Sequence, residues 1–118
     1  VAWSAYSKTL ANTAGFVKVW DQVKSAGDYV RYSWTVKVDA DCVFFPARLR
    51  THLQSLRAPA DKPIYVTNSL PKFGLEGFLG PVEILSRAAL EAYFDNTKAC
   101  QQYIGMNSGE DGFMKDCL

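Results

Sequence analysis

An apolar run that ends in two aspartates constrains this chain more than any other feature. Residues 34–46 read Trp-Thr-Val-Lys-Val-Asp-Ala-Asp-Cys-Val-Phe-Phe-Pro, and the β-branched residues before Asp39 favour a partly buried strand. Asp39 and Asp41 are two residues apart, so an extended backbone places both carboxylates on one side. Crowded carboxylates repel unless a cation lies between them or one is protonated. This pattern predicts a site for Mg²⁺ or Mn²⁺ at the strand end.

The same two aspartates have a simpler interpretation as a solvated turn, which is the commoner fate of an Asp-x-Asp pair. Two features favour the metal site. Apolar residues flank the pair on both sides, and aspartate is disfavoured inside strands. Both interpretations stay open from these residues alone.

The length of 118 residues allows one small domain with a single core. The net charge is +1 and the basic residues are scattered, so we expect no nucleic-acid partner. No apolar stretch reaches the length of a membrane span. Because the chain begins with Val1, we expect it to be a mature or excised piece.

The three cysteines lack the Cys-x-x-Cys spacing of a zinc site. Cys100 and Cys117 would close a modest loop, worth about 3 kcal/mol if they are bridged, but the sequence leaves their pairing open. Cys42 lies within an apolar run and is expected to be a buried free thiol.

The spacing of apolar residues predicts helices and strands in alternation. Helices are expected over about 4–26, 46–56 and 87–97, and strands over 29–38 and 64–67. Gly27 is a plausible stop for the first helix, Pro46 suits the first turn of the second, and Ser86 suits the cap of the third. The alternation predicts an α/β domain with a mixed sheet flanked by helices.

Four further side chains have expected positions. Trp20 and Trp34 are expected in the core, as is Leu53, which belongs to an apolar stripe on the second helix. His52 lies on that helix and is expected at the surface.

Two more motifs follow the aspartates in the chain. The first reads Gly-Leu-Glu-Gly-Phe-Leu-Gly over 74–80 and leads into Glu-Ile-Leu-Ser-Arg-Ala-Ala over 83–89. The second is Gly109-Glu110-Asp111. In this order the three motifs resemble the metal-binding half of GT-A type glycosyltransferases, in particular galactosyltransferase-like and fringe-like members. The resemblance covers about 16–118.

The resemblance implies a nucleotide-diphosphate sugar donor held through Mn²⁺ or Mg²⁺, with a glycan, protein or lipid as acceptor. Asp41 would be the direct metal ligand, and Asp39 would contact the ribose or the metal. Glu110 or Asp111 would be the general base that takes the acceptor proton. A second set of residues would line the donor or acceptor pocket, namely Glu76, Gly77 and Phe78. Localisation in the lumen of the Golgi or endoplasmic reticulum is implied in the same way.

The chain departs from that family because only some 30 residues precede the aspartate strand, where a nucleoside-binding βα portion is usual. We therefore expect 1–118 to be a single domain that is a fragment of a larger catalytic domain, and activity of the isolated chain stays open.

Two other interpretations of the aspartates remain. In a haloacid dehalogenase-type phosphatase, Asp39 would be the nucleophile and Asp41 the acid/base, although Met106 then stands where an acidic ligand is wanted. Alternatively, the chain is a non-catalytic sugar-binding module.

Overall fold

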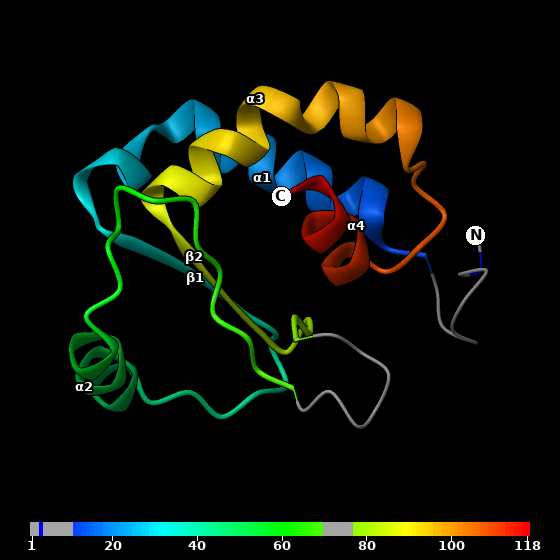
Figure 1. The fold of residues 1–118 in the computed structure, drawn as a ribbon. Coiled ribbons are helices and arrows are strands. Elements are labelled where there is room, and N and C mark those ends of the chain that lie inside the picture. Colours follow the sequence, from blue (N-terminus) through cyan, green and yellow to red (C-terminus); the bar gives the residue numbers. More distant parts are fainter. Residues whose placement is uncertain (1–2, 4–10, 70–76) are drawn as a thin grey trace.

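The computed structural model describes residue 3, residues 11–69 and residues 77–118, and these form a small α/β domain (Figure 1). Its elements in chain order are α1 (Thr13–Ala26), the short 3₁₀ helix η1 (Asp28–Arg31), β1 (Trp34–Val38), α2 (Pro46–Leu56), β2 (Val82–Ser86), α3 (Arg87–Tyr103) and α4 (Glu110–Cys117). Among the described residues, no helix combines the length and the apolar character that a membrane crossing requires.

The sheet differs from the predicted mixed sheet. In the part of the chain that the structure describes, it consists of β1 and β2, which pair antiparallel with Lys37 opposite Glu83. The segment 64–67, predicted as a strand, contributes only an isolated bridge between Tyr65 and Leu85. Side-chain alternation indicates that a segment is extended but says nothing about the direction of its neighbour, which the path of the intervening chain decides.

The helices are distributed unequally over the two faces of the sheet. Figure 1 shows α1, α3 and α4 gathered on one side of the strands, and α2 on the other. Contacts join α3 to α4, α1 to α4, and α3 to both strands. The buried core lies on that three-helix side and includes Val17, Trp20, Phe78, Leu85, Ala89, Leu90, Tyr93, Phe94, Phe113 and Met114.

Helix α1 forms where apolar residues recur at helical spacing. Its buried residues are Thr13, Val17 and Trp20, which lie four and three positions apart and therefore on one face. The helix ends at Gly27, as predicted, in the left-handed conformation with φ of 72° that glycine tolerates best. The predicted strand over 29–38 starts later, at Trp34, because one turn of 3₁₀ helix follows Gly27 directly.

Helix α3 begins as the sequence predicts and extends further. The Ser86 hydroxyl accepts a hydrogen bond from the Ala89 N–H at 3.1 Å, which satisfies one of the free donors of the first turn. The helix continues past the predicted end to Tyr103. A disulfide between Cys100 and Cys117, whose Cα atoms are 5.5 Å apart, links it to α4.

Helix α2 has Pro46 in its first turn, as predicted, but buries none of its residues. The predicted core stripe is therefore wrong: Leu53 is half-buried and Leu56 is 49% exposed. Apolar spacing reveals one apolar side of a helix but not how much protein covers it. His52 is exposed, as predicted.

Candidate functional site

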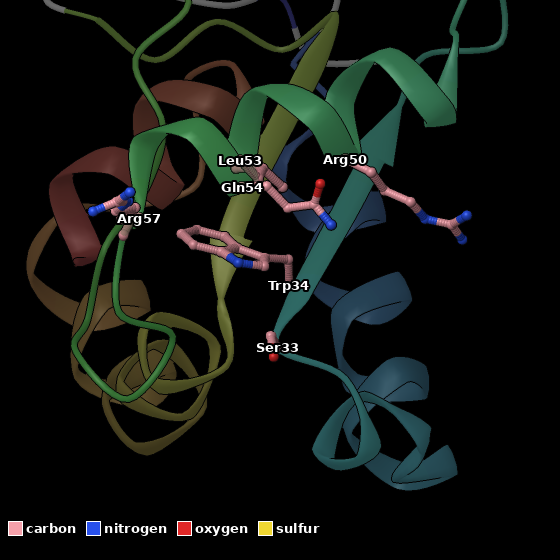
Figure 2. A pocket seen from close by; sticks show the side chains of 7 residues that line it. Ser33, Trp34, Arg50, Leu53, Gln54 and Arg57 are labelled. Atoms are coloured by element: carbon pink, nitrogen blue, oxygen red, sulfur yellow. The ribbon is translucent and has the colours of Figure 1, made fainter.

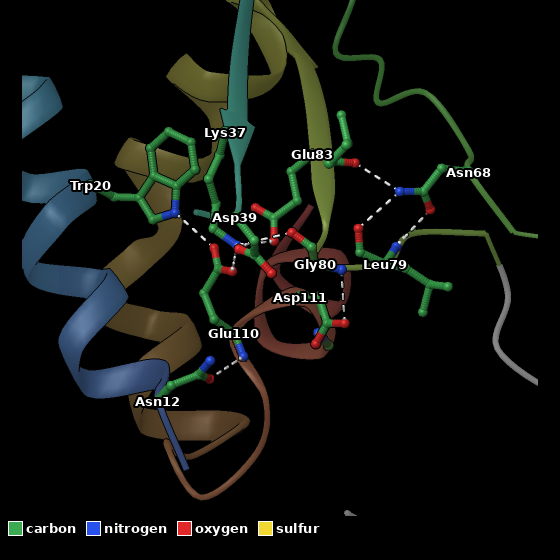
Figure 3. Close-up of polar contacts among 12 residues, drawn as sticks. Asn12, Trp20, Lys37, Asp39, Asn68, Leu79, Gly80, Glu83, Glu110 and Asp111 are labelled. Atoms are coloured by element: carbon green, nitrogen blue, oxygen red, sulfur yellow. Dashed lines mark hydrogen bonds and ion pairs between the residues drawn. The ribbon is translucent and has the colours of Figure 1, made fainter. Parts of the chain in front are cut away.

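The side chain of Lys37 lies at the centre of three carboxylates on the three-helix side of the sheet (Figure 3). Its Nζ atom is 3.1 Å from Asp39 Oδ1, 3.0 Å from Glu83 Oε1 and 2.9 Å from Glu110 Oε2. It also donates a hydrogen bond to the Gly80 carbonyl at 3.2 Å. We call Lys37, Asp39, Glu83 and Glu110 the Lys37 cluster.

The register of the sheet and the start of α4 bring these residues together. Glu83 lies opposite Lys37 in the antiparallel pair, where directly opposed side chains share one face. Glu110 is the first residue of α4, and its N–H donates to Asn12 Oδ1 at 3.0 Å. The Trp20 indole N–H donates to Glu110 Oε1 at 2.9 Å. Both oxygens of the Glu110 carboxylate thus have partners, and its residue is only 3% exposed.

Burial makes Glu83 an unusual carboxylate. The residue is fully buried, and its Oε2 atom has no hydrogen-bond partner among the residues that the structure describes. Burial, and then the neighbouring Glu110 carboxylate, raise the pKa of Glu83 to about 9, against an opposing effect of Lys37. A neutral Glu83 reduces the charge repulsion inside the cluster, since three carboxylates otherwise face a single ammonium.

The ammonium of Lys37 is held in its charged form. Burial by itself would lower its pKa, but hydrogen bonding and charge attraction from Glu110 and Glu83 more than offset this, so the pKa of Lys37 is raised. The Phe16 ring adds a cation–π contact, with Nζ 4.3 Å from the ring centroid. Lys37 is therefore a fixed positive charge that holds the cluster together.

The two aspartates predicted as metal ligands lie in a turn and not in an extended segment. Strand β1 ends at Val38, and the Cys42 N–H donates to the Asp39 carbonyl at 3.0 Å, which closes a four-residue turn. Strand alternation therefore does not place their two carboxylates on one side, contrary to the prediction. Asp39 is half-buried beside Lys37, whereas Asp41 is exposed, and Cys42, expected to be buried, is a half-buried free thiol.

The second and third motifs meet the end of β1. The Asp39 N–H donates to the Pro81 carbonyl at 3.0 Å, and the Gly80 N–H donates to Asp111 Oδ2 at 3.1 Å. Asp111 lies in the first turn of α4, next to Glu110. The aspartate turn, the glycine segment and the late acidic pair are thus in contact although about 70 residues of chain separate the first from the last (Figure 3).

Of the three predicted pocket residues, Glu76 lies outside the described residues. Phe78 is 4% exposed and packs edge-to-face against Tyr65 at a centroid distance of 5.1 Å. Gly77 has a φ of 85°, and a Cβ there would lie 2.7 Å from the Thr67 side chain. Glycine is required at this position by both conformation and space.

The donor set fits a metal ion only in part. Within the described residues, no group of three or more His, Cys, Asp or Glu side chains is arranged to hold an ion. Asp39 and Asp41 supply two carboxylates, a number that suits Mg²⁺ when substrate phosphates and waters complete its shell.

Sequence reasoning missed three members of this site. Lys37, Glu83 and Trp20 were not predicted to share one contact network, which they form through Glu110. A signal was present, because Lys37 and Glu83 are each the single charged residue of a largely apolar segment, where an unpaired charge is costly.

Comparisons with known proteins found no relative of this chain. No family model matches the chain, and searches of curated proteins and of solved structures found no match.

Proposed function

We propose that this chain is the metal-binding part of a glycosyltransferase that moves a sugar from a nucleotide-diphosphate donor to an acceptor hydroxyl. One observation carries the proposal: three motifs far apart in sequence meet at the end of β1. Contacts of Asp39 with Lys37 and Pro81, and of Gly80 with Asp111, join them. The resemblance to GT-A type enzymes rests on the same motifs.

Asp39 and Asp41 would hold the Mn²⁺ or Mg²⁺ of the donor. A divalent ion there stabilises the negative charge that the departing nucleoside diphosphate gains. The local charge favours a cation, since the Lys37 cluster contains one ammonium and three carboxylates, and keeps a net negative charge even when Glu83 is protonated. Lys37 orients Asp39 by the ion pair at 3.1 Å and leaves Asp41 at the surface for the incoming complex.

Asp111 is the stronger candidate for the general base. Both carboxylates accept protein hydrogen bonds at both of their oxygens, so burial is what separates them. Glu110 is 3% exposed, and this burial keeps an acceptor hydroxyl away. Asp111 is half-buried and next to the glycine segment, and its hydrogen bond from Gly80 holds the carboxylate in place. It can accept the acceptor proton if the hydroxyl comes within hydrogen-bond reach. Glu110 then serves as an anchor for Lys37 and Trp20.

Gly77 and Phe78 would shape the substrate pocket without contacting the reacting atoms. The buried Phe78 ring anchors the glycine segment to the core, and Gly77 allows the backbone of that segment to turn beside Thr67.

Thermal unfolding with and without Mn²⁺ tests the proposal. We expect uridine or guanosine diphosphate to raise the melting temperature only when Mn²⁺ is present, because neither the metal nor the diphosphate alone completes the coordination shell. Asp41→Asn should abolish this gain. Asp95→Asn is the matched control, since Asp95 is an exposed aspartate on α3 away from the site.

Three outcomes would overturn the proposal. If no nucleoside diphosphate raises the melting temperature in the presence of Mn²⁺, the chain does not contain the proposed donor site. Hydrolysis of a simple phosphate ester that Asp39→Asn abolishes would identify a phosphatase instead. Metal-independent binding of a sugar by the Asp39→Asn variant would favour a non-catalytic binding module.

A further inference from the structure

A second concave site lies on the opposite face of the sheet, between α2 and the start of β1 (Figure 2). Its volume is about 440 Å³. The main lining residues are Ser33, Trp34, Arg50, Leu53, Gln54 and Arg57. We call it the Trp34 groove. Trp34 and Lys37 are three positions apart on β1, so their side chains point to opposite faces, and the groove is separate from the Lys37 cluster.

The groove combines an aromatic surface with two uncommitted cations. Figure 2 shows Arg50 and Arg57 on either side of the Trp34 indole, with Gln54 between them along α2. In the described part of the chain, neither guanidinium makes a hydrogen bond or an ion pair. A guanidinium presents a planar fork of donors that matches an oxyanion, and here both forks are available to a ligand.

The segment of chain that contains α2 is also positively charged. Residues 42–60 contain three arginines and no acidic residue, although the whole chain carries a net charge of only +1. An anionic ligand at the groove would therefore meet no repelling carboxylate on α2.

Arg57 occupies a position that favours glycine. It ends α2 in the left-handed conformation with φ of 50°, the single non-glycine residue with positive φ among those the structure describes. Glycine at such a position avoids the steric cost of a Cβ. The arginine thus sets a cation beside Trp34 at the expense of local backbone stability, a pattern found at binding sites.

From these features we infer that the Trp34 groove binds an acidic oligosaccharide, one that carries carboxylate or sulfate groups on sugar rings. Arg50 lies on α2 and Arg57 directly follows its last residue, seven positions further along the chain. Their backbone positions therefore lie about 10 Å apart along the helix axis. Two separated cations that flank a ring surface match anionic groups spaced along a chain of rings. A nucleoside diphosphate, by contrast, has its phosphates contiguous at one end.

The other lining groups suit hydroxyl-rich rings. Gln54 offers both a donor and an acceptor, as does the Ser33 hydroxyl, and the indole offers a flat apolar face with an N–H at its edge. As the acceptor site of a transferase, this groove would hold the growing saccharide at a distance from the aspartate turn. That role rests on the proposed function, whereas the binding itself does not.

Titration of the 118-residue chain with a heparin-derived tetrasaccharide, in the absence of metal and nucleotide, tests the inference. Calorimetry gives the affinity, and the indole N–H signal of Trp34 in nuclear magnetic resonance, assigned with Trp34→Phe, reports the location. We expect that signal to shift on binding. We also expect Arg50→Gln and Arg57→Gly each to weaken binding at least tenfold.

The controls separate this groove from general attraction to a basic protein. Arg48 lies on the same helix but stacks on Phe45, at 4.8 Å from the ring centroid, and does not line the groove. Arg48→Gln removes the same charge and should change the affinity less than twofold. Arg57→Gly should lose binding while its melting temperature stays equal or rises, which excludes unfolding as the cause.

Several results would overturn the inference. These are absence of binding, an equal loss in Arg48→Gln, equal binding of neutral chitotetraose, and equal or tighter binding of uridine diphosphate or tetraglutamate at the groove. Because no metal or nucleotide is present, a failed transferase test leaves this result interpretable. Conversely, a failure here leaves the metal-dependent donor test unaffected.

Discussion

The two faces of the β1–β2 sheet differ in how completely the rest of the chain covers their charged side chains. On the three-helix face, Lys37 is surrounded by protein, and each of its carboxylate partners comes from a different part of the chain. On the other face, α2 buries no residue and leaves Arg50 and Arg57 without partners among the described residues. The comparison teaches that a buried charge requires a complete set of partners, whereas an exposed charge stays available for a ligand.

The largest effect should follow from Lys37→Met, which removes the cation and leaves the carboxylates of Asp39 and Glu110 without their ion-pair partner. We expect a loss of about 3–5 kcal/mol in the free energy of unfolding, as for other broken buried ion pairs. Urea unfolding measures it. Lys98→Met, at an exposed position of α3, should change stability by less than about 0.5 kcal/mol. Similar values for both variants would contradict the difference drawn between a buried charge and an exposed one.

A pair of leucine truncations compares the packing of the faces directly. Leu85 is fully buried on the three-helix face, and Leu85→Ala should cost about 2–5 kcal/mol. Leu53 is half-buried in the Trp34 groove, so Leu53→Ala should cost about 1 kcal/mol or less. Equilibrium unfolding of both variants in urea gives the difference. A loss above about 2 kcal/mol for Leu53→Ala would mean that α2 is packed far more tightly than its exposure indicates.

The disulfide strengthens only the three-helix face, where it joins α3 to α4. Replacement of both Cys100 and Cys117 by serine should cost about 3 kcal/mol, since the bridge closes a loop with a sequence separation of 17. Thermal unfolding under non-reducing conditions measures the change. Cys42→Ser, which removes a half-buried free thiol, should have a much smaller effect. An unchanged melting temperature in the double variant would show that the bridge contributes nothing to this face.

The stability of the three-helix face should also depend on pH, through Glu83. The folded state raises the pKa of Glu83 to about 9 from an ordinary value of 4.5, so it binds more protons than the unfolded state. Stability should therefore fall as pH rises through this interval, from about pH 5 to about pH 9. The charged groups that act on Glu83 are Glu110, which raises its pKa, and Lys37, which lowers it.

Glu83→Gln should flatten this decline, because glutamine does not titrate. Urea midpoints at a series of pH values test the expectation, and Glu91→Gln at an exposed position of α3 is the control. A stability that rises with pH over the same interval in the parent chain would contradict the neutral state of Glu83.

Local features of the structure were predictable. The stop at Gly27, Pro46 in the first turn of α2 and the cap at Ser86 each depend on the residue itself and its near neighbours. The end of α3 was placed too early because its last turns are fixed by packing and by the disulfide to α4.

The candidate site was predictable as a set of motifs but not as a geometry. Asp39, Asp41, Glu110 and Asp111 stand out in the sequence, and all of them lie in or beside the region where the motifs meet. The contacts of these residues could not be predicted from the sequence. The turn at Asp39 and its ion pair with Lys37 depend on where β1 ends and where α4 begins. Trp34, expected in the core, lines the open groove for the same reason.

By itself, the sequence determined the end of α1 at Gly27, the start of α2 at Pro46, the cap of α3 at Ser86 and which residues carry charge. These properties come from interactions between residues a few positions apart. The tertiary structure alone decided that Lys37 is buried among carboxylates and that α2 leaves its arginines exposed. Such outcomes depend on long-range contacts and on how much of each face the rest of the chain covers, and no local pattern encodes them.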